Sequence, residues 1–222
     1  MTVASVEHKP YSRKPAAPFM TSTLQQEAGR RLHFTSERTM RIAQRLYENG
    51  HITYMRTDST SLSQQGLSAA RNSATSIYGA EYVSDSPRVY DRKVKNSQEA
   101  HEAIRPAGDT FRTPAQVAGE LRGSEYAMYE LIWKRTVASQ MADAKGSTAT
   151  IRMRADLTGC EAGEVAEYTA SGTVITFRGF LAAYEEGTDE PAQPAKDGEA
   201  RLPKVEEGAS LDVVDATQVV DE

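Results

Sequence analysis

The chain has 222 residues, of which 39% are hydrophobic and 26% are charged, a composition typical of a globular protein with room for two domains of about 100 residues each. No apolar run approaches the ~20 residues of a membrane span, and the first residues lack the apolar core of a signal peptide, which predicts a cytoplasmic protein. A single cysteine, Cys160, excludes an intramolecular disulfide and a zinc site built on several cysteines.

The net charge of −5 is distributed unevenly along the chain. Residues 1–143 hold 19 Lys and Arg against 15 Asp and Glu, and residues 144–222 hold 7 against 16, so the two parts carry +4 and −9. The asymmetry predicts that the first part faces a polyanion, while the second is a solvated support. The plainer alternative is an acidic linker, because residues 185–203 combine acidic residues with Pro and Gly and are typical of a loop.

The N-terminal residues are typical of a strand that leads into a proline-rich link. Proline cannot sit inside a helix or a central strand, so the strand is expected to end where the prolines begin. The link is marked by Pro10, Pro15 and Pro18.

Helical spacing of apolar residues predicts the next two elements. The first helix begins with a capping box made by Ser22 and Gln25. The second has Ser36 as its N-cap and ends at the Asn49-Gly50 pair, which is a strong stop signal.

Residues 51–57, HITYMRT, alternate like a short strand, and the helical pattern that follows them ends at Gly79. Two helices, a tight stop and a short strand are typical of a winged-helix (CAP-like) unit. Residues 80–112 look irregular, and we interpret the basic cluster within them as a solvated loop. The cluster consists of Arg88, Arg92, Lys93 and Lys95.

A short helix is predicted from Thr113-Pro114 to about Leu121, and the segment SEYAMYELIWKRTVASQM then forms the strongest amphipathic helix. Its apolar stripe is interpreted as a face packed on the core rather than as a cofactor site. The stripe consists of Tyr129, Ile132, Trp133, Val137 and Met141.

After Gly146 the apolar period changes from helical to alternating, which predicts strands. The segments STATIRMRAD, EVAEYTA, TVITFRGF and SLDVVDA each read as one strand, with a hairpin turn at Ser171-Gly172. The predicted fold class is therefore α+β, with a helical domain over 16–143 and a β-rich domain over 1–15 plus 144–222.

A strand at residues 51–57 would place Tyr54, Arg56 and Asp58 on one face, with Met55 and Thr57 on the other. A tyrosine can attack a phosphodiester reversibly, because its phenolate, with a pKa near ~10, is also a good leaving group. An arginine fork fits the non-bridging oxygens on which charge develops. From residue types alone, however, such a pair is far more often an ordinary surface or core pair.

Several motifs in order make the chain similar to the bacterial type IA DNA topoisomerase I family. These are PFMTSTLQQEAGRRL, AQRLYENG, GHITYMRTDSTSLS, NSQEAHEAIRP and YELIWKRTVASQMADAKG, and VKNSQEAHEAIRPAG looks most like the actinobacterial members. The resemblance implies that Tyr54 cuts one DNA strand and becomes joined to its 5′ phosphate. The intact strand then passes and the break is resealed, which relaxes negative supercoils without ATP.

The resemblance also assigns roles to residues near Tyr54. It places Arg56 on the scissile phosphate and His101 close to the active site, where it assists proton movement or holds a phosphate. Arg105 contacts backbone phosphate or, as the alternative, pairs with Glu102. Asp58 either orients Arg56 or, as we favour, caps the Ser/Thr-rich turn. The expected DNA-binding residues are Arg56, Thr57, Asp58 and Arg105.

The family also carries an N-terminal metal-binding fold of the Toprim type, which holds Mg²⁺ through a glutamate and an Asp-x-Asp pair that this sequence lacks. The resemblance therefore implies an internal piece of a longer, monomeric, nucleoid-associated enzyme, with a helical gate domain and part of a β-rich arch. Its expected partners are single-stranded DNA and the remaining domains, without which the piece should not relax DNA. The alternative is a non-catalytic winged-helix module that binds duplex DNA.

Overall fold

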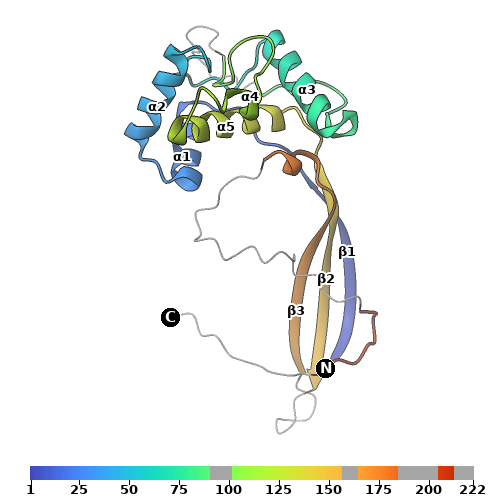
Figure 1. Ribbon diagram of the computed structural model, residues 1–222. Helices are drawn as coiled ribbons and strands as arrows, with labels where there is room; N and C mark the ends of the chain where they lie inside the picture. Colours follow the sequence, from blue (N-terminus) through green and yellow to red (C-terminus); the bar gives the residue numbers. More distant parts are fainter. Residues whose placement is uncertain (91–101, 157–164, 185–204, 213–222) are drawn as a thin grey trace. The chain divides into compact units, whose positions relative to one another are not determined.

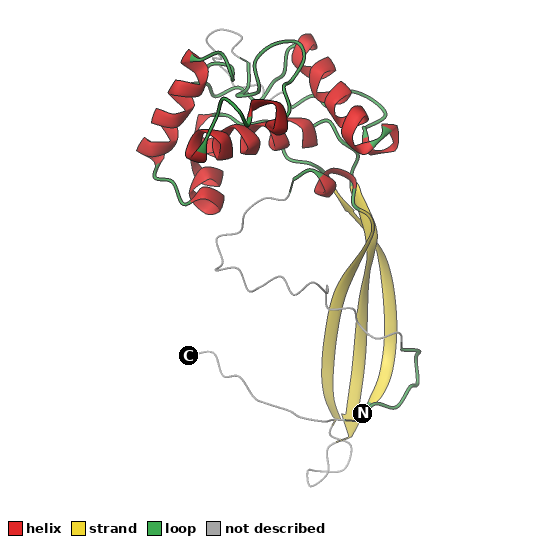
Figure 2. Ribbon diagram, in the orientation of Figure 1, coloured by secondary structure: helices red, strands yellow, loops and turns green. Residues whose placement is uncertain are grey.

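The computed structural model describes residues 1–90, 102–156, 165–184 and 205–212. They fall into two units, one built from helices and one from a three-stranded sheet, which confirms the predicted α+β class (Figures 1 and 2). The helical unit comprises residues 13–144 and 178–192, and the sheet unit comprises 1–12, 145–177 and 193–222, each within the described ranges. The elements are β1 (Thr2–Arg13), α1 (Thr21–Leu32), α2 (Ser36–Glu48), α3 (Gln64–Tyr78), η1 (Ala80–Tyr82), α4 (Pro114–Val117), α5 (Gly123–Ala138), β2 (Ala144–Asp156), β3 (Val165–Phe177) and η2 (Gly179–Ala182).

Helix α5 is the central element of the helical unit. It contacts α1, α2, α3 and α4, and it lies between α2 and α3 in Figure 1. The predicted apolar stripe is buried, but Met128 and Leu131, outside that stripe, are buried as well. Burial of each such side chain is worth about 1.5–3 kcal/mol, so α5 holds its neighbours together from several sides. No helix in the described ranges is long and apolar enough to cross a membrane.

Helix α1 begins earlier than the capping signal predicted. Its N-cap is Met20, whose N–H donates to the hydroxyl of Thr23 over 3.0 Å. Ser22 therefore lies inside the helix, and the predicted capping box with Gln25 is wrong. Threonine can fill the same hydrogen-bonding role from the third helical position, which the sequence pattern did not distinguish.

The ends of α2 and α3 follow the sequence signals more closely. The N-cap of α2 is Thr35, whose hydroxyl accepts from the Arg38 N–H over 3.2 Å, so Ser36 is the first helical residue rather than the cap. Both predicted stops are confirmed, because Gly50 and Gly79 have φ values of 72° and 101°, which favour glycine.

The sheet has the order β1-β2-β3, and β2 and β3 pair in antiparallel fashion. The predicted hairpin turn at Ser171-Gly172 is wrong, because both residues lie within the continuous strand β3. They pair with Thr150 and Ala149 of β2. The Thr150 and Ser171 hydroxyls lie 3.2 Å apart, a cross-strand contact that supports this register.

Strand β1 runs through Pro10 to Arg13, beyond the point where the proline-rich link was expected to begin. It lies at the edge of the described sheet, where the missing N–H of a proline can face away from the ladder. Of the predicted last strand, Ser210 forms an isolated bridge with Thr2, and residues beyond 212 lie outside the described ranges.

Residues 178–184, expected in the β-rich domain, group with the helices instead. The Phe180 N–H donates to Ala142 O over 2.9 Å, and the hydroxyl of Tyr184 donates to the buried Glu27 Oε1 over 2.7 Å. Burial, followed by that hydrogen bond to Glu27, raises the pKa of Tyr184. The expected acidic loop at 185–203 lies outside the described residues.

Candidate active site around Tyr54

The segment that carries Tyr54 does not form the predicted strand. Ile52 makes an isolated bridge with Pro106, and residues 53–62 belong to no strand. Two other segments, 19–21 and 102–107, hold this part of the chain through the hydrogen bonds described below.

The first of these contacts joins Thr53 to residues 103–105. The Thr53 N–H donates to Arg105 O over 2.9 Å, and the Arg105 N–H donates to Thr53 Oγ1 over 3.0 Å. The Thr53 hydroxyl in turn donates to Ala103 O over 2.7 Å. The Thr53 hydroxyl thus bonds to backbone groups of residues 103 and 105, which in a sheet would pair with the backbone of a neighbouring strand.

The second contact joins Thr21, the first residue of α1, to Thr57. The Thr21 N–H donates to Thr57 O and the Thr57 N–H donates to Thr21 Oγ1, each over 2.9 Å. Two contacts, to Thr53 and Thr57, therefore fix the backbone on both sides of Tyr54 and Arg56.

Side chains in this segment alternate between the interior and the surface, as the sequence predicted, although no strand forms. Met55 and Thr57 are 4% and 7% exposed, whereas Tyr54 is 43% exposed and Arg56 and Asp58 are also exposed. The Tyr54 ring meets the Tyr47 ring edge to face, with centroids 5.2 Å apart and planes at 70°. This contact orients the Tyr54 ring and leaves its hydroxyl accessible.

Arg56 and Asp58 form no hydrogen bond or ion pair with each other or with any other described residue. The Ser59 N–H donates to Thr57 Oγ1 over 3.1 Å, so Thr57 rather than Asp58 caps the Ser/Thr-rich turn. The Thr57 side chain is buried, and Asp58 is exposed.

Arg105 is buried, and of its two expected alternatives the pair with Glu102 is formed. Its Nε and Nη2 donate to the two Glu102 carboxylate oxygens over 2.6 and 2.9 Å. Its Nη1 donates to the carbonyl oxygens of Pro106 and Gly108 over 2.7 and 2.9 Å. Glu102 Oε1 also accepts from the Ser63 N–H over 2.8 Å. The pair ties residues 102–108 to the start of α3 and supports the Thr53 contact.

This pair predicts a pH dependence of stability. Burial opposes ionisation of Glu102, but the hydrogen bonds from Arg105 and Ser63 outweigh it, and the pKa of Glu102 is lowered from its ordinary value. A lowered pKa stabilises the fold above the unfolded-state pKa, and this contribution is lost as the pH falls through the folded-state pKa. Urea titrations should therefore show that the free energy of unfolding falls less between about pH 5 and pH 3 in Glu102→Gln than in the unsubstituted chain.

At pH 7 the same Glu102→Gln substitution should cost about 1–3 kcal/mol, because the buried Arg105 guanidinium loses its counter-ion. Glu37→Gln is a matched control, since Glu37 pairs with Arg41 on an exposed face of α2. Its expected cost is below about 1 kcal/mol. An equal loss in both variants, or an unchanged pH dependence in Glu102→Gln, would show that the pair of Arg105 and Glu102 does not contribute as described.

Of the remaining predicted basic and catalytic residues, the structure describes only Arg88. His101, Arg92, Lys93 and Lys95 lie outside the described residues. Arg88 is described, and it is not in a solvated loop. Its Nη2 pairs with Asp143 and its Nε donates to Met141 O over 2.9 Å, which anchors residue 88 against the chain after α5.

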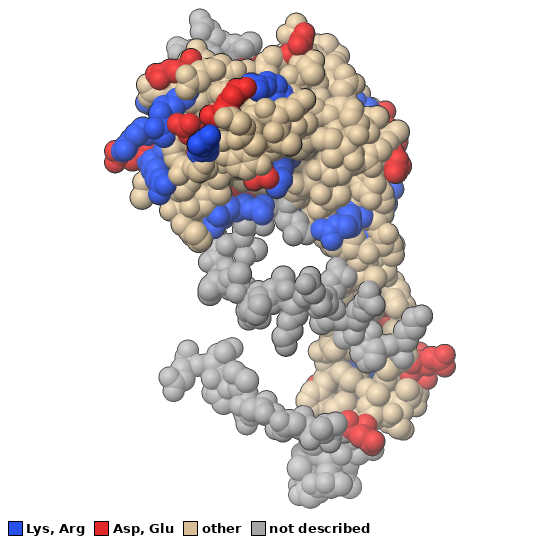
Figure 3. Space-filling model, viewed as in Figure 1, with Lys and Arg blue, Asp and Glu red and all other residues tan. Residues whose placement is uncertain are grey.

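Charges of both signs are interspersed on the face of the helical unit shown in Figure 3. Arg41 lies 2.6 Å from Glu37, and Arg45 lies 3.0 Å from Glu125. These arginines are neutralised locally. Arg56 differs from them, because within the described residues it has no acidic partner that would compete with an anionic ligand.

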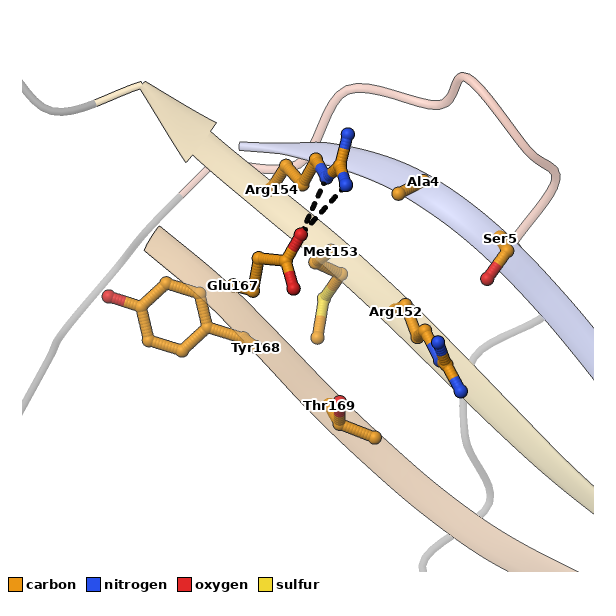
Figure 4. A pocket seen from close by; sticks show the side chains of 8 residues that line it. All are labelled: Ala4, Ser5, Arg152, Met153, Arg154, Glu167, Tyr168 and Thr169. Atoms are coloured by element: carbon orange, nitrogen blue, oxygen red, sulfur yellow. Dashed lines mark hydrogen bonds and ion pairs between the residues drawn. The ribbon is translucent and has the colours of Figure 1, made fainter. Parts of the chain in front are cut away.

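A hollow on the sheet also carries arginines, but their charges are paired. It is lined by residues of all three strands, including Arg152 and Arg154 (Figure 4). Arg154 Nε and Nη2 lie 2.9 and 2.8 Å from Glu167 Oε1, and Arg152 Nη2 lies 4.0 Å from Glu7 Oε1. The hollow also contains an exposed tyrosine, Tyr168, but its arginines are paired, whereas Arg56 near Tyr54 has no acidic partner among the described residues.

Comparisons with known proteins agree with the motifs. The family model described as DNA topoisomerase matches residues 1–221. The chain is 61% identical over 219 residues to DNA topoisomerase 1 of Mycobacterium leprae and 59% identical over 216 residues to that of Mycolicibacterium smegmatis, covering 98% and 97% of this chain. It spans 23% of the length of each relative. The structure of full-length topoisomerase I from Thermotoga maritima matches with a TM-score of 0.67 and 34% identity, over 89% of this chain and 32% of that one.

Proposed function

Because this chain belongs to the DNA topoisomerase family, we propose that it carries the nucleophile of a type IA enzyme, which cuts and reseals one DNA strand. The Tyr54 hydroxyl attacks a backbone phosphorus, the phenolic oxygen becomes bonded to the 5′ phosphate, and the 3′ oxygen of the preceding sugar leaves with a proton. One phosphodiester replaces another, so resealing needs no ATP. The observation that carries the proposal is an exposed Tyr54 two residues from an exposed Arg56, which has no partner among the described residues, on a segment held by hydrogen bonds.

Arg56 is proposed to bind the non-bridging oxygens of the attacked phosphate. Negative charge grows on these oxygens during attack, and a guanidinium can meet two of them at once. His101 is proposed, on the family resemblance, to assist proton movement or hold a phosphate. Among the other expected DNA contacts, Asp58 is exposed, whereas Thr57 and Arg105 are buried and form hydrogen bonds that hold this segment.

Relaxation of supercoils is proposed for a longer protein, because this chain spans 23% of its curated relatives. The helical part would act as the gate domain and the β-rich part as a piece of the arch. Within the described ranges, no group of three or more His, Cys, Asp or Glu could hold a metal ion. The proposal places the Mg²⁺ ligands in a separate Toprim domain, and it makes single-stranded DNA the ligand of a monomeric, nucleoid-associated enzyme.

The test is to trap the covalent intermediate and locate it. For this purpose the chain replaces the 216 matching residues of the M. smegmatis relative, and the product is called the grafted protein below. A single-stranded oligonucleotide labelled at its 3′ end is incubated with the grafted protein and Mg²⁺, then denatured. The label should stay on the protein, because the 5′ end of the downstream piece is joined to tyrosine. After nuclease and trypsin digestion, the nucleotide should be found on the peptide 46–56, and fragmentation of this peptide should place it on Tyr54 rather than on Tyr47.

Two results would contradict the proposal. An adduct on another residue would show that Tyr54 is not the nucleophile. DNA binding without any adduct would favour the non-catalytic winged-helix module. The separate chain should leave negatively supercoiled plasmid unchanged under the same conditions.

A further inference from the structure

The hydroxyl of Thr21 contacts the backbone on both sides of Arg56. Its Oγ1 lies 2.8 Å from Met55 O and 3.0 Å from Thr57 O. The two carbonyl oxygens share the single hydroxyl proton as acceptors. It also accepts from the Thr57 N–H over 2.9 Å. We infer that Thr21 is a positioning residue, which sets the direction of Arg56 and Tyr54 without contacting DNA. The inference rests on the proposed function.

Thr21 is well placed for this role because it belongs to a rigid part of the helical core. It is the first residue of α1, which is anchored by the fully buried side chains of Leu24 and Ala28. Just before it, Phe19 is also fully buried, and its carbonyl oxygen accepts from the Ile104 N–H over 2.8 Å. The Thr21 hydroxyl therefore fixes the backbone around Arg56 relative to the buried core of the helical unit.

No strand ladder could take over if this hydroxyl were removed, because residues 53–62 belong to no strand. The Thr21 N–H bond to Thr57 O would remain, but the Thr57 N–H and Met55 O would lose their partner. Arg56 lies between these two buried residues, so a change in their backbone would turn its guanidinium. Displacements of about 1 Å in a catalytic group can cost on the order of 100-fold in rate.

The experiment compares Thr21→Val, which keeps the shape but removes the hydroxyl, with Thr21→Ser, which keeps the hydroxyl. In the grafted protein, Thr21→Val should slow single-turnover cleavage by about tenfold or more, while the Kd for single-stranded DNA changes by less than about twofold. Thr21→Ser should cleave within about threefold of the parent. Thr113→Val is the control, since the Thr113 hydroxyl also bonds at a helix start, as the N-cap of α4 at 3.3 Å from the Gln116 N, and it should leave cleavage unchanged.

A second measurement keeps the inference testable without catalysis. In the chain itself, exchange of the Thr57 amide hydrogen should be faster in Thr21→Val than in the parent and close to the parent in Thr21→Ser. Unchanged exchange in Thr21→Val, or cleavage at the parental rate, would overturn the inference. Equally slow cleavage by Thr21→Val and Thr21→Ser would overturn it as well. The proposed function has a separate test: it would be contradicted if the grafted protein without substitutions formed no adduct.

Discussion

Tyr54→Phe should abolish the covalent adduct of the grafted protein, while the Kd for single-stranded DNA stays within about twofold of the parent. The substitution removes the attacking oxygen but keeps the ring that packs edge to face against Tyr47. Tyr54 is 43% exposed, and its hydroxyl bonds to no described residue, so the fold should not be affected. Adduct formation is measured with the 3′-labelled oligonucleotide, and binding by fluorescence anisotropy.

Tyr47→Phe is the matched control for this prediction. Tyr47 is also 43% exposed, and its ring centroid lies 5.2 Å from that of Tyr54, so the same atom is removed a short distance away. Adduct formation should continue in Tyr47→Phe. If Tyr47→Phe lost the adduct and Tyr54→Phe kept it, the nucleophile would be assigned to the wrong ring.

Arg56→Ala should lower the single-turnover cleavage rate by about 100- to 1000-fold, the range found when one donor to a developing oxyanion is removed. Arg56→Lys should recover only part of this loss, because an ammonium group cannot contact two phosphate oxygens in the same planar fork. Neither change should alter the free energy of unfolding by more than about 0.5 kcal/mol, since Arg56 is exposed and unpaired among the described residues. Rates are measured at saturating DNA and stability by urea titration.

Arg41→Ala provides the control for general loss of positive charge. Arg41 is exposed on α2 and pairs with Glu37, so its removal should leave the cleavage rate unchanged. One result for Arg56→Ala would exclude a role in the transition state. If Arg56→Ala weakened DNA binding but cleaved at the parental rate once saturated, Arg56 would hold the bound DNA without stabilising the transition state.

Features that depend on nearby residues could be derived from the order of amino acids. The ends of α2 and α3 follow from Gly50 and Gly79, because glycine has no Cβ and adopts a positive φ without steric cost. The alternation of Tyr54, Met55 and Arg56 between surface and interior follows from polarity and an extended backbone. Several motifs, including the one around Tyr54, also indicated the family, since each is a contiguous run of residues.

Features that depend on distant residues could not be derived in this way. Thr21 and Thr57 are 36 positions apart, and Thr53 and Arg105 are 52 positions apart, yet their hydrogen bonds replace the strand predicted at 51–57. Glu102 could be named as a partner for Arg105, but the burial of Arg105 depends on packing against the start of α3. Periodicity reports which face of a segment is apolar, and it carries no information on which remote segment supplies the partners.

The same reason explains the error in the sheet. Ser171-Gly172 has the composition of a turn, and a local pattern cannot show that β2 supplies partners on both sides of it. Pairing with Thr150 and Ala149 satisfies the backbone of both residues and keeps β3 continuous. Local sequence patterns thus indicated the helix ends and, through the family resemblance, Tyr54 as the proposed nucleophile. Folding in three dimensions decided the hydrogen bonds that hold the segment around Tyr54 in place, because those bonds join segments far apart in the chain.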